Sequence, residues 1–186
     1  MDWMNEPPEW TEAGGLLTAV TGARTDFWRH THYGFVRDDG HFRHAAAPGD
    51  FSAGVAFRGD YQALYDQAGL MLRLDAANWI KAGIEYVDGR RMLSVVVTRE
   101  HSDWSTTPMP VAAPWVRLRL TRKGSAVHLH WAADPEPERF RMLRLAWFPP
   151  GGAVRVGPMC CSPERAGFRA EFRGFEVGPP AQPGEG

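Results

Sequence analysis

The centre of the chain alternates between apolar and polar residues with a period of two. The pattern is strongest in AGLMLRLD, residues 68–75, and in WIKAGIEYV, residues 79–87. Such alternation is typical of β-strands with one buried face. One face of these two strands would carry Leu70, Leu72, Ile80 and Ile84, and the other Met71, Arg73, Trp79, Lys81 and Glu85.

Similar runs continue along the chain and are separated by turn residues. Residues 92–99 follow an Asp88-Gly89 turn, and Val95 and Val97 would share the apolar face. Further strands are expected over 115–122, 126–132, 139–148 and 168–177. No segment keeps a helical period between caps. The spacing predicts an all-β protein, either a sandwich or a jelly roll of antiparallel sheets.

The expected organisation is one jelly-roll domain over residues 1–177. The sequence contains no internal repeat. Its end, GPPAQPGEG over residues 178–186, is rich in proline and glycine and is predicted to be a disordered tail.

Composition excludes several classes of function. The formal net charge is −1, which gives no electrostatic basis for binding nucleic acid or an anionic membrane. The start, MDWMNEPPEW, does not read as a secretory signal, and no apolar stretch is long enough to span a bilayer. A cytoplasmic location is therefore expected. Cys160 and Cys161 are adjacent, which favours reduced buried thiols, with a vicinal redox pair as the alternative.

The polar face of the central strands is the first candidate site. Arg73, Lys81 and Glu85 would lie there beside Trp79. On a curved sheet they would form a groove in which charges bind hydroxyl groups and a ring stacks on a sugar. The alternative is a solvated face with weak cross-strand ion pairs.

The segment EHSDWSTTPMP, residues 100–110, is expected to be a long loop, and it carries His101, Asp103, Trp104 and Ser105. It lacks a Gly-x-Ser-x-Gly elbow, which argues against a serine hydrolase. A glycosidase needs two carboxylates at a set separation. Glu85 has no evident partner on its strand, although Asp66 could approach it from a neighbouring one.

Neither a metal nor a cofactor is expected. His30 and His32 would share one side of a strand, as would His128 and His130, but neither pair has an evident third ligand.

Several segments resemble a known family. YDQAGLMLRLDAANWIKAGIEYVDG, LSVVVTREHSDWS, TDFWRHTHYGFVRDDGHF, MLRLAWFPP and VGPMCCSP are similar to motifs of a family of uncharacterised concanavalin A-like proteins. That family includes the fungal regulation-of-enolase proteins and bacterial relatives. The resemblance, from about residue 3 to about residue 177, implies a jelly-roll sandwich of two antiparallel sheets, one of them concave. Many relatives of that wider fold bind or cut carbohydrates. The Glu-x-Asp-x-Glu motif of laminarinase-like enzymes is absent here, where the nearest stretch is IEYVDG.

The stretch TDFWRHTHYGF, residues 25–35, is expected to be a strand. Phe27, Tyr33 and Phe35 would face one way and Trp28 the other, with Trp28 at the edge of the ligand groove and the other rings between the sheets; the alternative is that all four rings are core.

Three functions are kept open. The first is a cytosolic protein that binds or acts on carbohydrate through the concave sheet. The second is a non-catalytic protein that regulates a metabolic enzyme, and the third is an enzyme acting on another small polar metabolite. For the first, Glu85 would accept sugar hydroxyls or act as acid and base. The predicted ligand-binding residues are Trp28, Asp66, Gln67, Arg73, Trp79, Lys81, Glu85 and Trp104.

Overall fold

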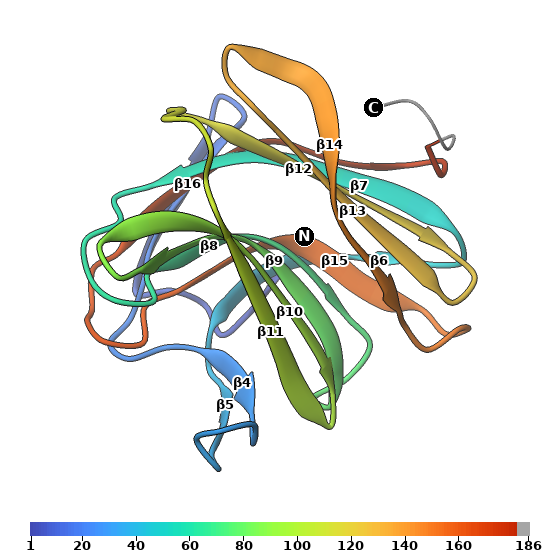
Figure 1. Ribbon diagram of the computed structural model, residues 1–186, viewed down its shortest axis with the longest axis horizontal. Helices are drawn as coiled ribbons and strands as arrows, with labels where there is room; N and C mark the ends of the chain where they lie inside the picture. Colours follow the sequence, from blue (N-terminus) through green and yellow to red (C-terminus); the bar gives the residue numbers. More distant parts are fainter. Residues whose placement is uncertain (182–186) are drawn as a thin grey trace.

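The computed structural model describes residues 1–181 and consists of two stacked antiparallel sheets (Figure 1). The first, here called sheet A, contains in spatial order β1 (Asp2–Met4), β6 (His41–Ala47), β15 (Val154–Cys161), β8 (Gln67–Arg73), β9 (Asn78–Val87), β10 (Arg90–Arg99) and β11 (His101–Pro108). The second, sheet B, contains β14 (Glu136–Trp147), β13 (Ala126–Ala133), β12 (Val116–Lys123), β7 (Phe51–Gly59), β16 (Arg169–Gly178), β3 (Leu16–Val20) and β2 (Glu9–Ala13). The predicted all-β sandwich of jelly-roll type is confirmed.

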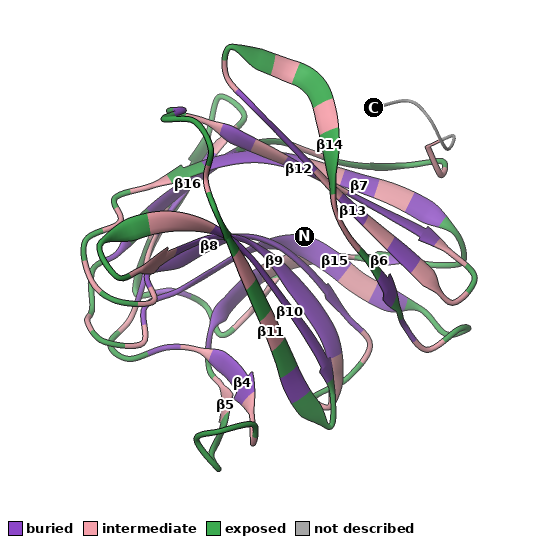
Figure 2. Ribbon diagram, in the orientation of Figure 1, coloured by how far each residue is buried: buried purple, intermediate pink, exposed green. Residues whose placement is uncertain are grey.

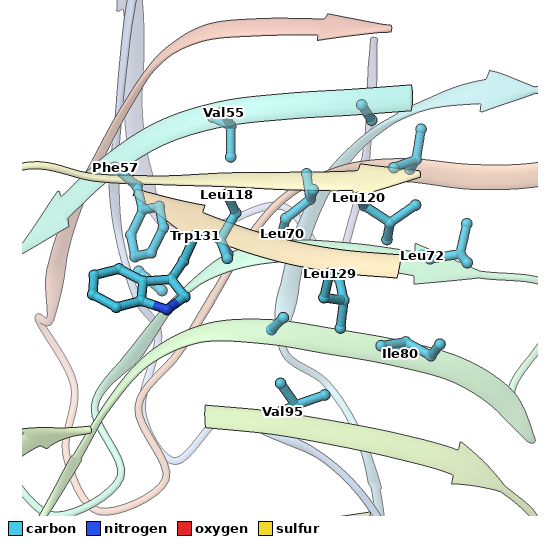
Figure 3. Close-up of a cluster of buried hydrophobic side chains, with 14 of the residues drawn as sticks. Val55, Phe57, Leu70, Leu72, Ile80, Val95, Leu118, Leu120, Leu129 and Trp131 are labelled. Atoms are coloured by element: carbon cyan, nitrogen blue, oxygen red, sulfur yellow. The ribbon is translucent and has the colours of Figure 1, made fainter. Parts of the chain in front are cut away.

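The main hydrophobic core fills the space between the sheets. Side chains of β8, β9 and β10 meet those of β7, β12 and β13 there (Figure 3). The predicted inward-facing residues are all buried in this core, namely Leu70, Leu72, Ile80, Ile84, Val95 and Val97. The register read from the alternation is therefore correct.

The predicted turns are also present. Asp88 and Gly89 have φ angles of 50° and 74° and join β9 to β10 with two residues. This left-handed pair is the geometry of a tight hairpin turn, and glycine adopts it without steric cost.

The segment at residues 100–110 was wrongly predicted to be a loop. Its residues His101–Pro108 form β11, which pairs with β10 along its whole length at the edge of sheet A. Its alternation is weak because one side of an edge strand meets solvent, as the green colour of β11 in Figure 2 shows.

The aromatic stretch at residues 25–35 is not one continuous strand. It forms β4 (Phe27–Arg29) and then a loop, and the chain returns as β5 (Val36–Asp38). His30 and His32 have φ angles of 57° and 64°, which end the alternation of faces. The β4–β5 hairpin lies on the side of sheet A that faces away from sheet B (Figure 1), so its rings do not fill the space between the sheets.

The two thiols are free and buried on opposite sides of sheet A. Cys160 belongs to the core between the sheets and Cys161 to the cluster on the outer side. Of the predicted tail, Gly178 ends β16 and the backbone N–H of Ala181 donates to Ser52, at 2.8 Å. Residues 182–186 of that prediction lie outside the described residues. Within residues 1–181, the structure contains no helix that is both long and apolar enough to cross a membrane.

Candidate functional site

The outer face of sheet A is covered, which corrects the expectation that its polar residues look out into a groove or into solvent. Arg73, Lys81 and Glu85 do lie on the face opposite the main core, yet they are only 3%, 3% and 6% exposed. A second apolar cluster surrounds them; it contains Phe27, Trp28, Phe42, Met71, Trp79, Val96, Met159 and Cys161.

The β4–β5 hairpin provides this cover, and an ion pair anchors it. The guanidinium of Arg73 donates two hydrogen bonds to the carboxylate of Asp38, at 2.7 and 2.8 Å. At the other end of the hairpin, the backbone N–H of Arg29 donates to the hydroxyl of Ser102 on β11, at 2.9 Å. Beside the first anchor, Phe27 is paired with Asp38 in the hairpin and packs against Trp79, with ring centroids 6.1 Å apart.

Local hydrogen bonds shape the entry to the hairpin. The side chain of Asp26 accepts the backbone N–H of Phe27, and the backbone carbonyl of Asp26 accepts the N–H of Gly40. A Cβ atom at position 40 would lie 2.4 Å from the ring of Phe27 and 2.5 Å from the sulfur of Cys161. Glycine is therefore required where the hairpin returns to the sheet.

A cavity of about 230 Å³ opens between the hairpin and the sheet. Its floor comes from β9 and β10, one wall from the hairpin, and the rest from β11 and the segments before β8 and after β15. The lining residues are Asp26, Trp28, Tyr33, Phe35, Tyr65, Lys81, Glu85, Val96, Trp104, Pro163 and Glu164.

Lys81 and Asp26 form an ion pair in the floor, with 2.9 Å between Nζ and Oδ1. Burial on its own would lower the pKa of Lys81, but the negative charges of Asp26 and Glu85 and the hydrogen bond to Asp26 act together to raise the pKa above its usual value. Lys81 is therefore a fixed ammonium group, suited to donating hydrogen bonds and unsuited to acting as a nucleophile at neutral pH.

Glu85 is the second charged group of the floor. Its Oε2 accepts hydrogen bonds from Ser94, at 2.6 Å, and from the indole N–H of Trp104, at 2.9 Å. Within residues 1–181, its Oε1 has no hydrogen-bond partner. Burial raises the pKa of Glu85, although the charge of Lys81 and the bond from Ser94 act in the opposite direction. Glu85 thus lines the cavity with a carboxylate whose orientation is fixed by two donors.

Aromatic rings form most of the remaining lining. Tyr33 meets Trp28 edge-on at 5.7 Å and stacks on Phe35 at 5.3 Å. On the facing side, Tyr65 meets Trp104 edge-on at 6.1 Å. The hydroxyls of Tyr33 and Tyr65 are 3.3 Å apart across the mouth, and this contact raises the pKa of Tyr65 to about 12.

Asp66 holds the Tyr65 side of the cavity in place. Its carboxylate accepts hydrogen bonds from Arg165, Ser162 and the backbone N–H groups of Gln62 and Ala63. Burial alone would raise the pKa of Asp66, but these donors hold it below its ordinary value. Tyr65 itself has a φ angle of 65°, so the network fixes a backbone conformation that few tyrosines adopt.

The structure brings together half of the predicted ligand-binding residues: Trp28, Lys81, Glu85 and Trp104 line the cavity. The other four do not line it. Asp66 is fully buried against Arg165 and is no partner for Glu85. Gln67 lies opposite Glu85 in the β8–β9 register and donates to the carbonyl of Tyr65. Arg73 binds Asp38, and Trp79 lies beneath Phe27.

Asp26, Tyr65, Pro163 and Glu164 also line the cavity, although they were not predicted from the sequence. No spacing rule connects them to β9, because they come from three separate loops. The only available signal was their position beside the quoted motifs, with Asp26 in TDFW and Pro163 at the end of VGPMCCSP. As for metals, residues 1–181 contain no group of three or more His, Cys, Asp and Glu side chains placed to hold an ion.

Solved structures with the same fold include carbohydrate-active proteins. The GH43 protein BlXynB (a K247S mutant) of Bacillus licheniformis has a TM-score of 0.70 and 15% identity, over 96% of this chain and 37% of that one. The carbohydrate-binding module CBM66 of Bacillus subtilis has a TM-score of 0.60 and 12% identity, over 95% of this chain and 94% of that one. At these identities the likeness shows the fold alone.

Two yeast matches are much closer. A crystal structure of a functionally unknown Saccharomyces cerevisiae protein has a TM-score of 0.93 and 40% identity, covering 97% of both chains. The S. cerevisiae protein named "Regulation of enolase protein 1" is 41% identical over 178 residues, which is 96% of this chain and 89% of that protein. Residues 3–180 match the family described as "Protein of unknown function (DUF1349)", and the chain belongs to that family.

Proposed function

We propose that the protein binds a small carbohydrate in the cavity beneath the β4–β5 hairpin. The observation that carries this proposal is the buried carboxylate of Glu85, which lines a cavity enclosed by five aromatic side chains. Carboxylates accept hydrogen bonds from hydroxyl groups, and aromatic faces stack on the C–H faces of sugar rings. The volume of about 230 Å³ is below the roughly 300–1,000 Å³ typical of pockets for drug-sized ligands, which suits one sugar ring.

Each lining residue would make a different contact with the sugar. Glu85 would accept hydroxyl groups, and Lys81 would donate to ring or hydroxyl oxygens. Trp28 and Trp104 would enclose the ring, while Tyr33 and Tyr65 would meet it at the mouth. Arg73 and Asp66 would act at a distance, because they hold the hairpin and the Tyr65 loop in position. The fold shared with a carbohydrate-binding module supports this reading as an analogy.

The test is calorimetric titration of neutral mono- and disaccharides after a thermal-shift screen. A ligand at a hundred times its dissociation constant stabilises the folded chain by about 2.7 kcal/mol. Glu85→Gln keeps the shape, and its amide oxygen can still serve Ser94 and Trp104, but an N–H₂ group replaces Oε1. Binding should weaken by about 1.5–3 kcal/mol, the range for a hydrogen bond to a charged group.

A matched control is Glu171→Gln. Glu171 is also a buried carboxylate, but it binds Arg58 on sheet B, away from the cavity. This variant should keep the wild-type affinity. If Glu85→Gln and Glu171→Gln bind a sugar equally well, the sugar does not occupy this cavity.

The role of Glu85 as acid and base also stays a prediction. Its raised pKa suits a general acid, and Asp26 is the second carboxylate near the floor, although it is paired with Lys81. Release of nitrophenol from aryl glycosides, lost in Glu85→Gln, would establish hydrolysis.

A second candidate function is the regulation of a metabolic enzyme by direct contact. The observation in its favour is the name of the yeast relative, "Regulation of enolase protein 1". The tip of the hairpin offers an apolar contact surface, since Tyr33, Phe35 and Val36 are 44–46% exposed. Co-purification of an enzyme with wild-type protein, lost in Phe35→Ser, would favour this function over sugar binding.

A further inference from the structure

The charge of the cavity restricts which sugars it can take. Among its lining residues, Asp26, Glu85 and Glu164 are acidic and Lys81 is the one base. Lys81 is already paired with Asp26 at 2.9 Å. The aromatic side chains around these groups present the negative faces and positive edges of their π-systems, and the faces attract cations rather than anions.

Four arginines on the segments around the cavity are paired with other carboxylates. Arg29 binds Glu100, and Arg37 binds Asp39. Arg73 binds Asp38, and Arg165 binds Asp66, each with 2.7 Å between nitrogen and oxygen. In the described part of the chain, no arginine lines the cavity.

A phosphate or carboxylate needs what this cavity does not offer. Buried anions are usually held by a bidentate arginine, several backbone N–H groups or a helix N-terminus. An anion placed beside Lys81 would have to compete with Asp26 and would approach Glu85 and Glu164. A hydroxyl or ammonium group would instead find hydrogen-bond acceptors in the carboxylates of Glu85 and Glu164.

We propose that this cavity selects sugars that are uncharged or carry a protonated amine, and that it excludes phosphorylated and carboxylated sugars. This inference rests on the proposed function and specifies its ligand class. It places the ligand among free sugars and their amines, before any kinase or dehydrogenase has added a negative charge.

The experiment compares four probes of one configuration at low ionic strength: glucose, glucosamine, glucuronate and glucose 6-phosphate. The matching galactose and mannose sets are run beside them. Calorimetry should detect binding of the neutral sugar and the amine of at least one set. The acid and the phosphate of that set should bind about tenfold more weakly or not at all, and tenfold corresponds to about 1.4 kcal/mol.

A charge reversal at the rim tests the cause. Glu164 is exposed, so Glu164→Lys changes the local charge by two without disturbing the floor. At separations of roughly 6–8 Å it should raise the affinity for glucuronate relative to glucose by about threefold to tenfold, and added salt should reduce this gain. Glu9→Lys on β2 makes the same charge change at a residue that does not line the cavity, and it should have a smaller effect.

The outcomes separate the two proposals. If glucuronate or glucose 6-phosphate binds as tightly as glucose, and Glu85→Gln weakens that binding, the cavity is the sugar site but the charge selectivity is refuted. The charge selectivity is also refuted if Glu164→Lys and Glu9→Lys change the affinity for glucuronate relative to glucose by the same factor. If no sugar of any charge binds, both the proposed function and this inference fail.

Discussion

The ion pair between Arg73 and Asp38 leads to a specific prediction about stability. Its two members are buried unequally, because the side chain of Arg73 is 3% exposed and that of Asp38 is 34% exposed. The Nε atom of Arg73 is buried without a hydrogen-bond partner in the described chain. The two members should therefore differ in how much their removal costs.

Asp38→Ala leaves a buried guanidinium without its carboxylate. Breaking a buried pair in this way costs about 3–5 kcal/mol, but the site of Asp38 is partly open to water, so we expect about 2–3 kcal/mol. Arg73→Met removes the charge and the unpartnered Nε and keeps the packing on Phe27, while Asp38 can be hydrated. We expect about 1 kcal/mol for that change.

Urea unfolding followed by tryptophan fluorescence measures both variants and the double variant. The double variant should be more stable than Asp38→Ala alone, because no uncompensated charge remains. Arg139→Met, which removes an exposed ion pair with Glu136 on β14, should stay within about 0.5 kcal/mol of wild type. A double variant less stable than Asp38→Ala would refute the reasoning.

Two further predictions concern the same region. Gly40→Ala should destabilise the fold by at least about 1–3 kcal/mol, because its Cβ would overlap the ring of Phe27; an unchanged urea midpoint would show that the hairpin can shift. Burial lowers the pKa of His41, whose ring nitrogens bond to two backbone groups at 2.6 and 3.0 Å. The unfolded chain therefore binds a proton at His41 more tightly than the folded chain does, so the stability of the fold should decrease as the pH drops below about 6.5. The decrease in the free energy of unfolding between pH 7 and pH 5 should be smaller in His41→Gln than in the wild type. An equal decrease would assign the effect to the other histidines.

The alternation of residues was sufficient to predict the sandwich and the orientation of its central strands. It places Ile80 and Lys81 on opposite faces because side chains in a strand must alternate. Alternation cannot say what covers a face. The covering residues Phe27 and Asp38 lie more than thirty positions before the residues that they contact, Trp79 and Arg73, and no local pattern links them.

For the same reason, only part of the site could be predicted from the sequence. Lys81 and Glu85 lie four residues apart on one strand, so both were found together. Trp104 was predicted from its residue type within residues 100–110, although that segment forms a strand and not a loop. Asp26 and Tyr65 belong to connections whose path depends on tertiary contacts, namely the pairing with Lys81 and the Asp66 network. Arg73 and Trp79 share the correct face but lie under the anchored part of the hairpin.

The buried cations of sheet A also have a consequence for folding. Strands β8 to β11 are neighbours in sequence and in space, so they can pair through short loops. The contacts Arg73–Asp38 and Lys81–Asp26 span 35 and 55 residues and close much larger loops. Until the hairpin docks, the outer face of this early meander presents Arg73 and Lys81 to solvent beside Met71 and Trp79. Charged groups on this face of the sheet, with Glu85 beside the two cations, oppose its stacking on a second unfinished chain. The residues that later shape the cavity would thus keep the nascent protein from aggregating.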